Sequence, residues 1–409
     1  MWTSEAFDAA VRRHDAQIAA SGLTIWVGSE PTYTDRTAQS AEWLNQALGG
    51  DKEQRANVLL DGLCRRFPGG VVLRSVGRQY PGEERPRWNL GLCRRRDGVP
   101  IWHGPPDPVQ AAREAEAVPE LDARAAALAA ELRARGFAVA PVKTEDALER
   151  RLLMRVDVDV PAPDTNDPRL IRPSVHACAT PASGLRDELA EAGAYLFLLS
   201  TQESHGRLTP RIELPMFAAV DLFLAVLDCV ARASLECHLP ALILAGYPPP
   251  VDAAMEWTTV TPDPAVIEIN TAPSVDAESF LERSREIYAA AADQGLDAYR
   301  LYFNGAVADS GGGGQITLGG PSPEASPFLQ EPLLLPRLVR FFNRHPALSY
   351  LLPRLRRQQR AIGAGPTLIS RSDFAIVTVG GYLGLARHLL TYPFCCPVPE
   401  GSGSVQELY

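Results

Sequence analysis

Two stretches carry the strongest signal in this sequence: VIEINTAP, residues 266–273, and DSGGGGQITLGG, residues 309–320. Side chains along a strand alternate between its two faces, so Val266, Glu268 and Asn270 share one face and the two isoleucines between them share the other. The isoleucine face is predicted to be core. The opposite face therefore carries a carboxylate and an amide as candidate oxygen ligands.

The four glycines Gly311, Gly312, Gly313 and Gly314 form the second part of the pattern. Without a Cβ, their backbone can come close to a bound group and offer N–H donors to an anion. Alone, such a run is more often a flexible hairpin loop. It is not followed by Gly-Lys-Ser/Thr, as in a P-loop, nor by a helix, as in a dinucleotide fingerprint. Beside the acidic strand, it indicates a site for a cation and a phosphate.

Composition narrows the class of protein. The 409 residues are 46% hydrophobic and 22% charged, which is typical of a globular chain with ample core material. A formal net charge of -9 argues against a broad basic face for nucleic acid. Seven cysteines without a CxxC pair favour neither a zinc ribbon nor a disulfide framework. Charges interrupt the most apolar helical stretch, residues 217–235, so we expect a cytoplasmic protein that does not enter a membrane.

The order of elements predicts an α+β fold with a mainly antiparallel sheet and flanking helices, because the strands follow no regular βαβ alternation. Residues 1–352 are expected to form one domain, with a possible subdivision near the Ala-rich helical region 110–150. The Arg-, Pro- and Trp-rich residues 77–96 are expected to be an irregular loop. Residues 353–409 change in character and are expected to be a divergent tail.

Several further segments carry a family resemblance. They are Gly28-Ser29-Glu30-Pro31-Thr32-Tyr33, Arg66-Phe67-Pro68-Gly69-Gly70, Tyr80-Pro81-Gly82-Glu83, Gly246-Tyr247-Pro248-Pro249-Pro250 and His345-Pro346-Ala347-Leu348-Ser349-Tyr350, in that order around the two stretches above. With this ordered set, residues 22–352 resemble a family of uncharacterised bacterial proteins called putative amidoligases, often fused to a transglutaminase-like domain. That family looks like a distant branch of the carboxylate-amine ligases with the fold of glutamine synthetase and glutamate-cysteine ligase, and the resemblance implies a curved antiparallel sheet.

The resemblance implies a chemistry. It implies ATP- and Mg²⁺-dependent joining of a small-molecule or peptide carboxylate to an amine through an acyl phosphate. Carboxylates on neighbouring strands of that superfamily hold divalent metals, and a glycine-rich turn ends in a metal-binding histidine. The positions that match here are Glu30, Glu268 with Asn270, and Gln315.

Two departures from the family pattern bear on activity. The glycine run normally ends in Asn-His, whereas here Gln315 follows it; an amide carbonyl can ligate a hard cation but brings no charge. Beyond Leu352 the family's segment with arginine and glutamate alternating on a strand is not recognised. A catalytically impaired nucleotide- or peptide-binding remnant, or an incomplete fragment, are therefore the alternatives to an active ligase.

The candidate residues have competing interpretations. Mg²⁺ prefers oxygen ligands, and Glu30, Glu203 and Glu268 are the candidate carboxylates. Glu30 could instead be an exposed turn residue and Glu203 a solvated acid at a hairpin end, whereas the apolar neighbours of Glu268 make a solvated face a weaker explanation. Arg78 and Arg87 could bind phosphate or a substrate carboxylate, but a surface ion pair with Glu83 or Glu84 explains them equally well.

Overall fold

The computed structural model describes residues 4–111, 119–157, 159, 161–177, 185–204, 206–302, 304–310, 315–322 and 324–344. The chain divides into two compact units. The first unit comprises Met1–Asn45 and Pro264–Tyr409, and the second comprises Gln46–Asp263. The predicted tail, residues 353–409, lies outside the described residues, as does the glycine run 311–314.

The second unit is built on a large mixed sheet. Its strands lie side by side in the order β10-β4-β3-β9-β8-β7-β6-β5. Their bounds are β3 Val71–Val76, β4 Trp88–Arg95, β5 Ala138–Val142, β6 Glu149–Arg155, β7 Ala194–Ser204, β8 Arg207–Leu214, β9 Ile243–Gly246 and β10 Met255–Asp263. β9 pairs in parallel with β3 and with β8, and the other neighbours in this order pair antiparallel. The predicted α+β class with a mainly antiparallel sheet is thus confirmed, with β9 as a parallel insertion.

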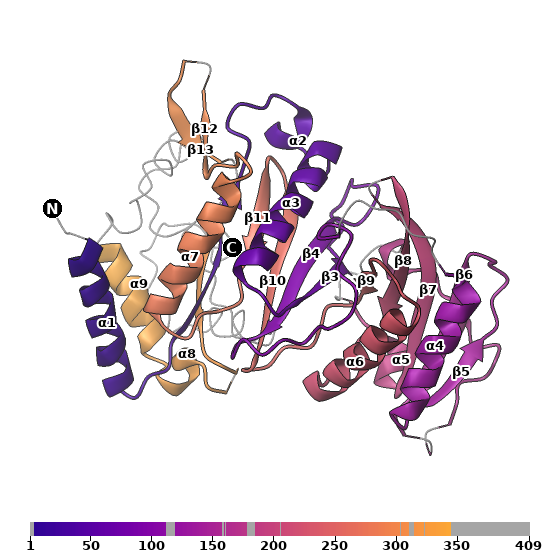
Figure 1. Cartoon of the computed structure of the whole chain (residues 1–409). Helices are drawn as coiled ribbons and strands as arrows, with labels where there is room; N and C mark the ends of the chain where they lie inside the picture. Colours follow the sequence, from indigo (N-terminus) through magenta and orange to yellow (C-terminus); the bar gives the residue numbers. More distant parts are fainter. Residues whose placement is uncertain are drawn as a thin grey trace. The chain divides into compact units, whose positions relative to one another are not determined.

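Helices flank this sheet. They are α3 Gly50–Arg66, α4 Leu121–Ala134, α5 Glu188–Glu191 and α6 Val220–Glu236, with short 3-10 turns η1 Pro168–Ile171 and η2 Val175–Ala177. α4 and α6 lie side by side and share one core with strands β6 to β9 (Figure 1). α3 carries acidic residues in its first turn and arginines in its last, which complements the helix dipole at both ends. Its apolar stripe is buried, including Leu59, Leu60 and Leu63 at 0% exposure.

The first unit contains short strand pairs and helices. Its strands are β1 Trp26–Glu30, β2 Thr32–Tyr33, β11 Val266–Asn270, β12 Tyr299–Leu301, β13 Val307–Asp309 and β14 Gln315–Gly319. Its helices are α1 Ser4–Ala20, α2 Ala41–Leu44, α7 Ala277–Ala292, α8 Pro327–Gln330 and α9 Leu334–Arg344. α1 packs against α7, where Arg12 pairs with Glu278 and Arg285 with Asp8. β12 and β13 form a hairpin.

The expectation of an irregular loop over residues 77–96 was wrong for its second half, which is strand β4. The arginines that suggested a loop are neutralised across the strand pair, because Arg94 and Arg96 both bind the buried carboxylate of Glu256. Gly91 makes room for a neighbour: a Cβ there would lie 1.7 Å from the Trp257 ring. Partners distant in sequence therefore overrode the local turn signals.

None of the described helices is long and apolar enough to cross a membrane.

Candidate functional site

The predicted ligand residues of the first unit lie on neighbouring strands. β1 ends at Glu30 and β2 begins at Thr32, with Pro31 between them. β1 pairs antiparallel with β14, and in this register Glu30 lies directly opposite Gln315. Directly opposite residues of an antiparallel pair point to the same face. Glu30 and Gln315, the residue that follows the glycine run, are thus cross-strand neighbours.

β11 flanks the same chain segment on its other side. Glu268 lies opposite Thr32. The Ile269 amide donates to the Pro31 carbonyl at 3.0 Å and the Thr271 amide donates to the Ser29 carbonyl at 2.9 Å. Continuing this register sets Asn270 opposite Glu30. Glu30 therefore has Gln315 on one side and Asn270 on the other, with Glu268 on the same face one pair away.

Two hydrogen bonds connect this polar face, which we define as Glu30, Thr32, Glu268, Asn270 and Gln315. The Asn270 amide Nδ2 donates to Glu268 Oε1 at 3.1 Å. The Thr32 hydroxyl shares a hydrogen bond of 2.8 Å with the hydroxyl of Ser310, and both residues are buried. Ser310 precedes the glycine run and Gln315 follows it. One end of the run therefore contacts the polar face through Ser310, and the other end continues into Gln315, which belongs to that face.

Gly28 shows how closely the strands pack beside this face. Gly28 is two residues before Glu30 on β1 and lies opposite Thr317 on β14. A Cβ at Gly28 would lie 2.5 Å from Thr317 Oγ1, so the threonine hydroxyl occupies the space above the glycine. The absence of a side chain at Gly28 is thus a packing requirement that extends the polar face by one hydroxyl.

The reverse face of these strands is apolar, as predicted. Ile267 and Ile269 are 0% exposed, whereas Glu268 and Asn270 are partly exposed. The ring of Tyr33 packs edge-on against Tyr288, with ring centroids 5.4 Å apart. Burial, and then the neighbouring Tyr288, raise the pKa of the Tyr33 hydroxyl. The alternation in residues 266–270 therefore separates core from polar face as the sequence indicated.

The donor atoms of the polar face suit a hard cation. They are carboxylate, amide and hydroxyl oxygens, the ligand types that Mg²⁺ prefers, and sulfur and imidazole are missing from them. Among the described residues no group of three or more His, Cys, Asp or Glu side chains could hold a metal ion. The acidic part of this face is therefore a pair, Glu30 and Glu268, with neutral amides beside it.

Arg87, in the second unit, is held by protein groups. Its Nε donates to Glu83 Oε1 at 2.9 Å, and its Nη1 donates to Asp263 Oδ1 at 2.6 Å and to the Pro262 carbonyl at 3.1 Å. The Tyr80 ring lies 4.2 Å from its guanidinium carbon. The ion pair with Glu83 that competed with a substrate role is thus present, and a role for Arg87 in substrate binding stays a prediction.

Arg78 and Glu203 are the other candidates in the second unit. Arg78 is exposed, and its carbonyl accepts a hydrogen bond of 2.9 Å from the Arg87 amide. Glu203 is exposed near the end of β7, opposite Leu208. It belongs to the strand, one pair before its end, rather than to the turn that the sequence suggested. Roles of Arg78 at phosphate and of Glu203 at a metal stay predictions.

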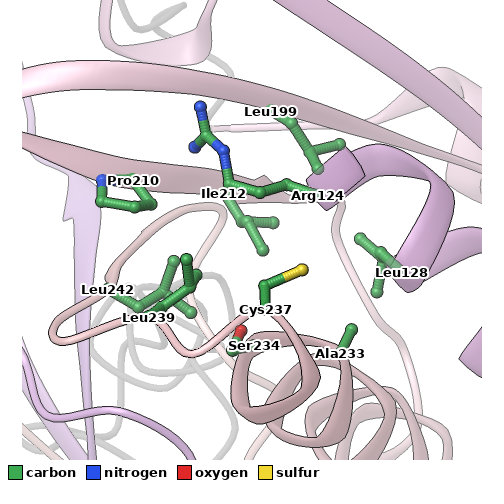
Figure 2. Close-up of a pocket in the computed structure, with 10 residues that line it drawn as sticks. All are labelled: Arg124, Leu128, Leu199, Pro210, Ile212, Ala233, Ser234, Cys237, Leu239 and Leu242. Atoms are coloured by element: carbon green, nitrogen blue, oxygen red, sulfur yellow. The ribbon is translucent and has the colours of Figure 1, made fainter. Parts of the chain in front are cut away.

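A small cavity lies elsewhere in the second unit, between α4, α6 and strands β7 and β8 (Figure 2). Its lining is mostly apolar, with Arg124, Ser234 and Cys237 as the polar members. Its volume of about 10 Å³ is close to that of one water probe. It is therefore a packing gap in the core rather than a substrate pocket.

Sequence reasoning missed Thr32, Ser310 and Thr317 as members or neighbours of the polar face. A signal for two of them was present, because Thr32 continues the period of Glu30 and Thr317 continues that of Gln315. Ser310 had no such signal, since its contact with Thr32 spans 278 residues.

Comparison with known proteins supports the resemblance. No curated protein and no solved structure matched the chain. A family model described as "Putative amidoligase enzyme (DUF2126)" matches residues 2–177 and 190–355, which is most of the chain. Together with the ordered motifs, this match shows that the chain belongs to the amidoligase family named in that description.

Proposed function

We propose that this chain is an ATP- and Mg²⁺-dependent amidoligase whose metal-binding part is the polar face of the first unit. The observation that carries the proposal is the register of three strand segments, which brings Glu30, Gln315, Asn270 and Glu268 to neighbouring positions on one face. Family membership supports ligase chemistry at a coarse level. The substrates are of two classes, a carboxylate and an amine.

The reaction proceeds in two steps. An oxygen of the substrate carboxylate attacks the γ-phosphorus of ATP, the bond to the bridging oxygen breaks, and ADP leaves with that electron pair. The amine nitrogen then attacks the acyl carbon, the C–O bond to phosphate breaks, and the nitrogen loses a proton to solvent or a base. Mg²⁺ would spread the negative charge that develops on the phosphate oxygens.

The residues of the polar face would hold that ion. Glu30 and Glu268 together carry two negative charges, which balance one divalent cation. Asn270 turns its amide nitrogen to Glu268, so its carbonyl oxygen is the atom that it can offer to a cation. Gln315 can add a second neutral carbonyl. This donor set fits one Mg²⁺ ion and gives no charge for a second.

The identity of Gln315 favours a second candidate function. Gln315 lies opposite Glu30 and brings a neutral amide to the face. A charged or imidazole ligand at this position would bind a metal ion more strongly. A nucleotide-binding protein that has lost turnover is therefore the alternative, and binding without amine-dependent ADP release would support it.

The test combines binding and turnover. Calorimetry measures ATP binding with and without Mg²⁺, and ADP release is measured across panels of carboxylates and amines. We expect Glu268→Gln to weaken Mg²⁺-dependent ATP binding at least about tenfold, because it removes one of two charges and perturbs the partner of Asn270. Glu5→Gln, an exposed position on α1, is the matched control and should bind as the parent does. Mg²⁺-independent binding that Glu268→Gln leaves unchanged would overturn the proposal.

A charge-gain variant tests the ion site without any assay of activity. Gln315→Glu sets two carboxylates directly opposite each other, which should lower the melting temperature without Mg²⁺. Added Mg²⁺ should then raise its melting temperature more than it raises that of the parent. An equal response of both proteins to Mg²⁺ would contradict the assignment of Glu30 and Gln315 to one ion.

A further inference from the structure

A second group of polar side chains lies in the second unit, around the buried carboxylate of Glu213 on β8. It contains Arg211 on the same strand and Arg172, Ser174 and His176 from the segment through η1 and η2. Glu213 is 0% exposed. The sequence showed the alternation of Arg211 and Glu213, but nothing local predicted the partners from residues 172–176.

The carboxylate of Glu213 has no capacity left for another donor. It accepts hydrogen bonds from Arg172 Nη1 at 2.9 Å, from Arg211 Nη2 at 3.2 Å, from the Val175 amide at 3.1 Å and from the Ser174 hydroxyl. These four bonds use its four lone-pair positions. Two guanidinium groups therefore share one saturated carboxylate.

Arg172 is left with an unused pair of donors. Its Nη1 is engaged by Glu213 and by the Pro173 carbonyl at 3.0 Å. Its Nε and Nη2 are buried and have no hydrogen-bond partner among the described residues. Buried donors without a partner are rare and costly. The Tyr247 ring, 5.7 Å from the guanidinium carbon, is the aromatic neighbour of this group.

Other arginines in this chain show which groups bind to the edge formed by Nε and Nη2. In each of five arginines, Nε and Nη2 donate side by side to one carboxylate: Arg74, Arg95, Arg150, Arg169 and Arg186. This two-point geometry matches carboxylate and phosphate oxygens. Arg172 presents the same edge without the oxyanion.

Among the described residues, no other charged group near Arg172 fills that role. The Asp187 carboxylate is close enough to act on Arg172 electrostatically, but it accepts from the backbone amides of Ala190 and Met216. His176 accepts from the Gly246 amide through Nε2 at 3.2 Å and so is bound as the neutral imidazole. The Arg172 side chain as a whole keeps 18% exposure, although its Nε and Nη2 atoms are themselves buried, so this edge lies just beneath the surface.

We propose that the Nε and Nη2 edge of Arg172 is a binding site for a small oxyanion, either a carboxylate or a phosphate group. Glu213 and the Pro173 carbonyl hold the guanidinium in place through Nη1, so the edge is oriented before the anion arrives. This site belongs to the second unit and stands independently of the metal-binding role proposed for the first.

The test uses the full chain and two probes, acetate and inorganic phosphate, each titrated at constant ionic strength set with sodium chloride. Binding is followed by calorimetry and by the Nε–H resonance of Arg172 in ¹⁵N-labelled protein. Arg172→Lys keeps the charge and removes the two-point edge. Arg169→Lys, whose own edge binds Asp167 at a more exposed position, is the matched control.

We expect saturable binding of at least one probe, with the Arg172 Nε–H resonance shifting along the same isotherm. Arg172→Lys should weaken binding at least tenfold and Arg169→Lys should leave it unchanged. Preference for acetate or for phosphate identifies the ligand class. Linear shifts without saturation for both probes, or equal affinity in the Arg172→Lys protein, would overturn the proposal. If that variant fails to fold, the resonance of the parent protein, assigned directly, still decides between these outcomes.

Discussion

Protonation of His176 should destabilise the folded chain in mildly acidic solution. Burial lowers the pKa of this imidazole from 6.5 to about 4; Arg211 adds to the effect and Glu213 opposes it. Its Nε2 also accepts the Gly246 amide, which a protonated ring could not do. Between these two pKa values the unfolded chain binds more protons than the native state, so stability rises with pH there.

The size of the effect follows from linkage. The contribution of His176 is fully present above its unfolded pKa of 6.5 and is lost as the pH falls toward about 4. A shift of one pKa unit corresponds to about 1.4 kcal/mol, so going from about pH 6.5 to about pH 5 should cost roughly 2 kcal/mol from this residue alone.

Urea unfolding followed by circular dichroism at about pH 7 and about pH 5 measures this loss. His176→Gln keeps an acceptor for the Gly246 amide but cannot protonate, so its unfolding free energy should fall by roughly 2 kcal/mol less than that of the parent over this range. His14→Gln, at a side chain that is 59% exposed, is the matched control. An equal loss of unfolding free energy by the parent and by His176→Gln between the two pH values would show that His176 does not carry this pH dependence.

Three further outcomes follow from packing and charge. Asp107→Asn leaves the half-buried Arg74, now bonded to Asp107 at 2.6 and 3.0 Å, without its buried counter-ion; urea unfolding should show a loss of about 3–5 kcal/mol, and a change below about 1 kcal/mol would contradict this. Gly28→Ala brings a Cβ to 2.5 Å from Thr317 Oγ1 and should cost about 1–3 kcal/mol, most of which the double variant with Thr317→Ala should recover in the same assay. Leu128→Ala enlarges the cavity between α4 and α6 and should cost about 2–5 kcal/mol in thermal unfolding; an unchanged melting temperature would mean that this gap is not part of a packed core.

Local patterns predicted some elements well. The alternation in residues 266–270 correctly separated Glu268 and Asn270 from the buried isoleucines, because period two is a property of any strand. The amphipathic stretch ending at Glu236 forms α6 for a similar reason, since its apolar stripe must face the core. β4 was missed because its arginines depend on Glu256, which lies far along the chain.

Candidate ligands could be listed from the sequence, but their grouping could not. Glu30, Glu268, Asn270 and Gln315 belong to segments far apart in the chain, and strand register alone makes them neighbours. The sequence alone likewise does not choose between a substrate role and an ion pair for Arg87, because its contact with Asp263 joins distant segments.

An oxygen-rich strand face, a glycine run and the ordered motifs of the amidoligase family can all be identified in the sequence alone. Those features are local, and each depends on residue type and spacing along one segment. The position of Gln315 opposite Glu30, and the unused donor edge of Arg172 beside the saturated Glu213, depend on tertiary contacts. Hydrogen-bond register and the pairing of buried charges join segments that are distant in sequence, so no local pattern encodes them.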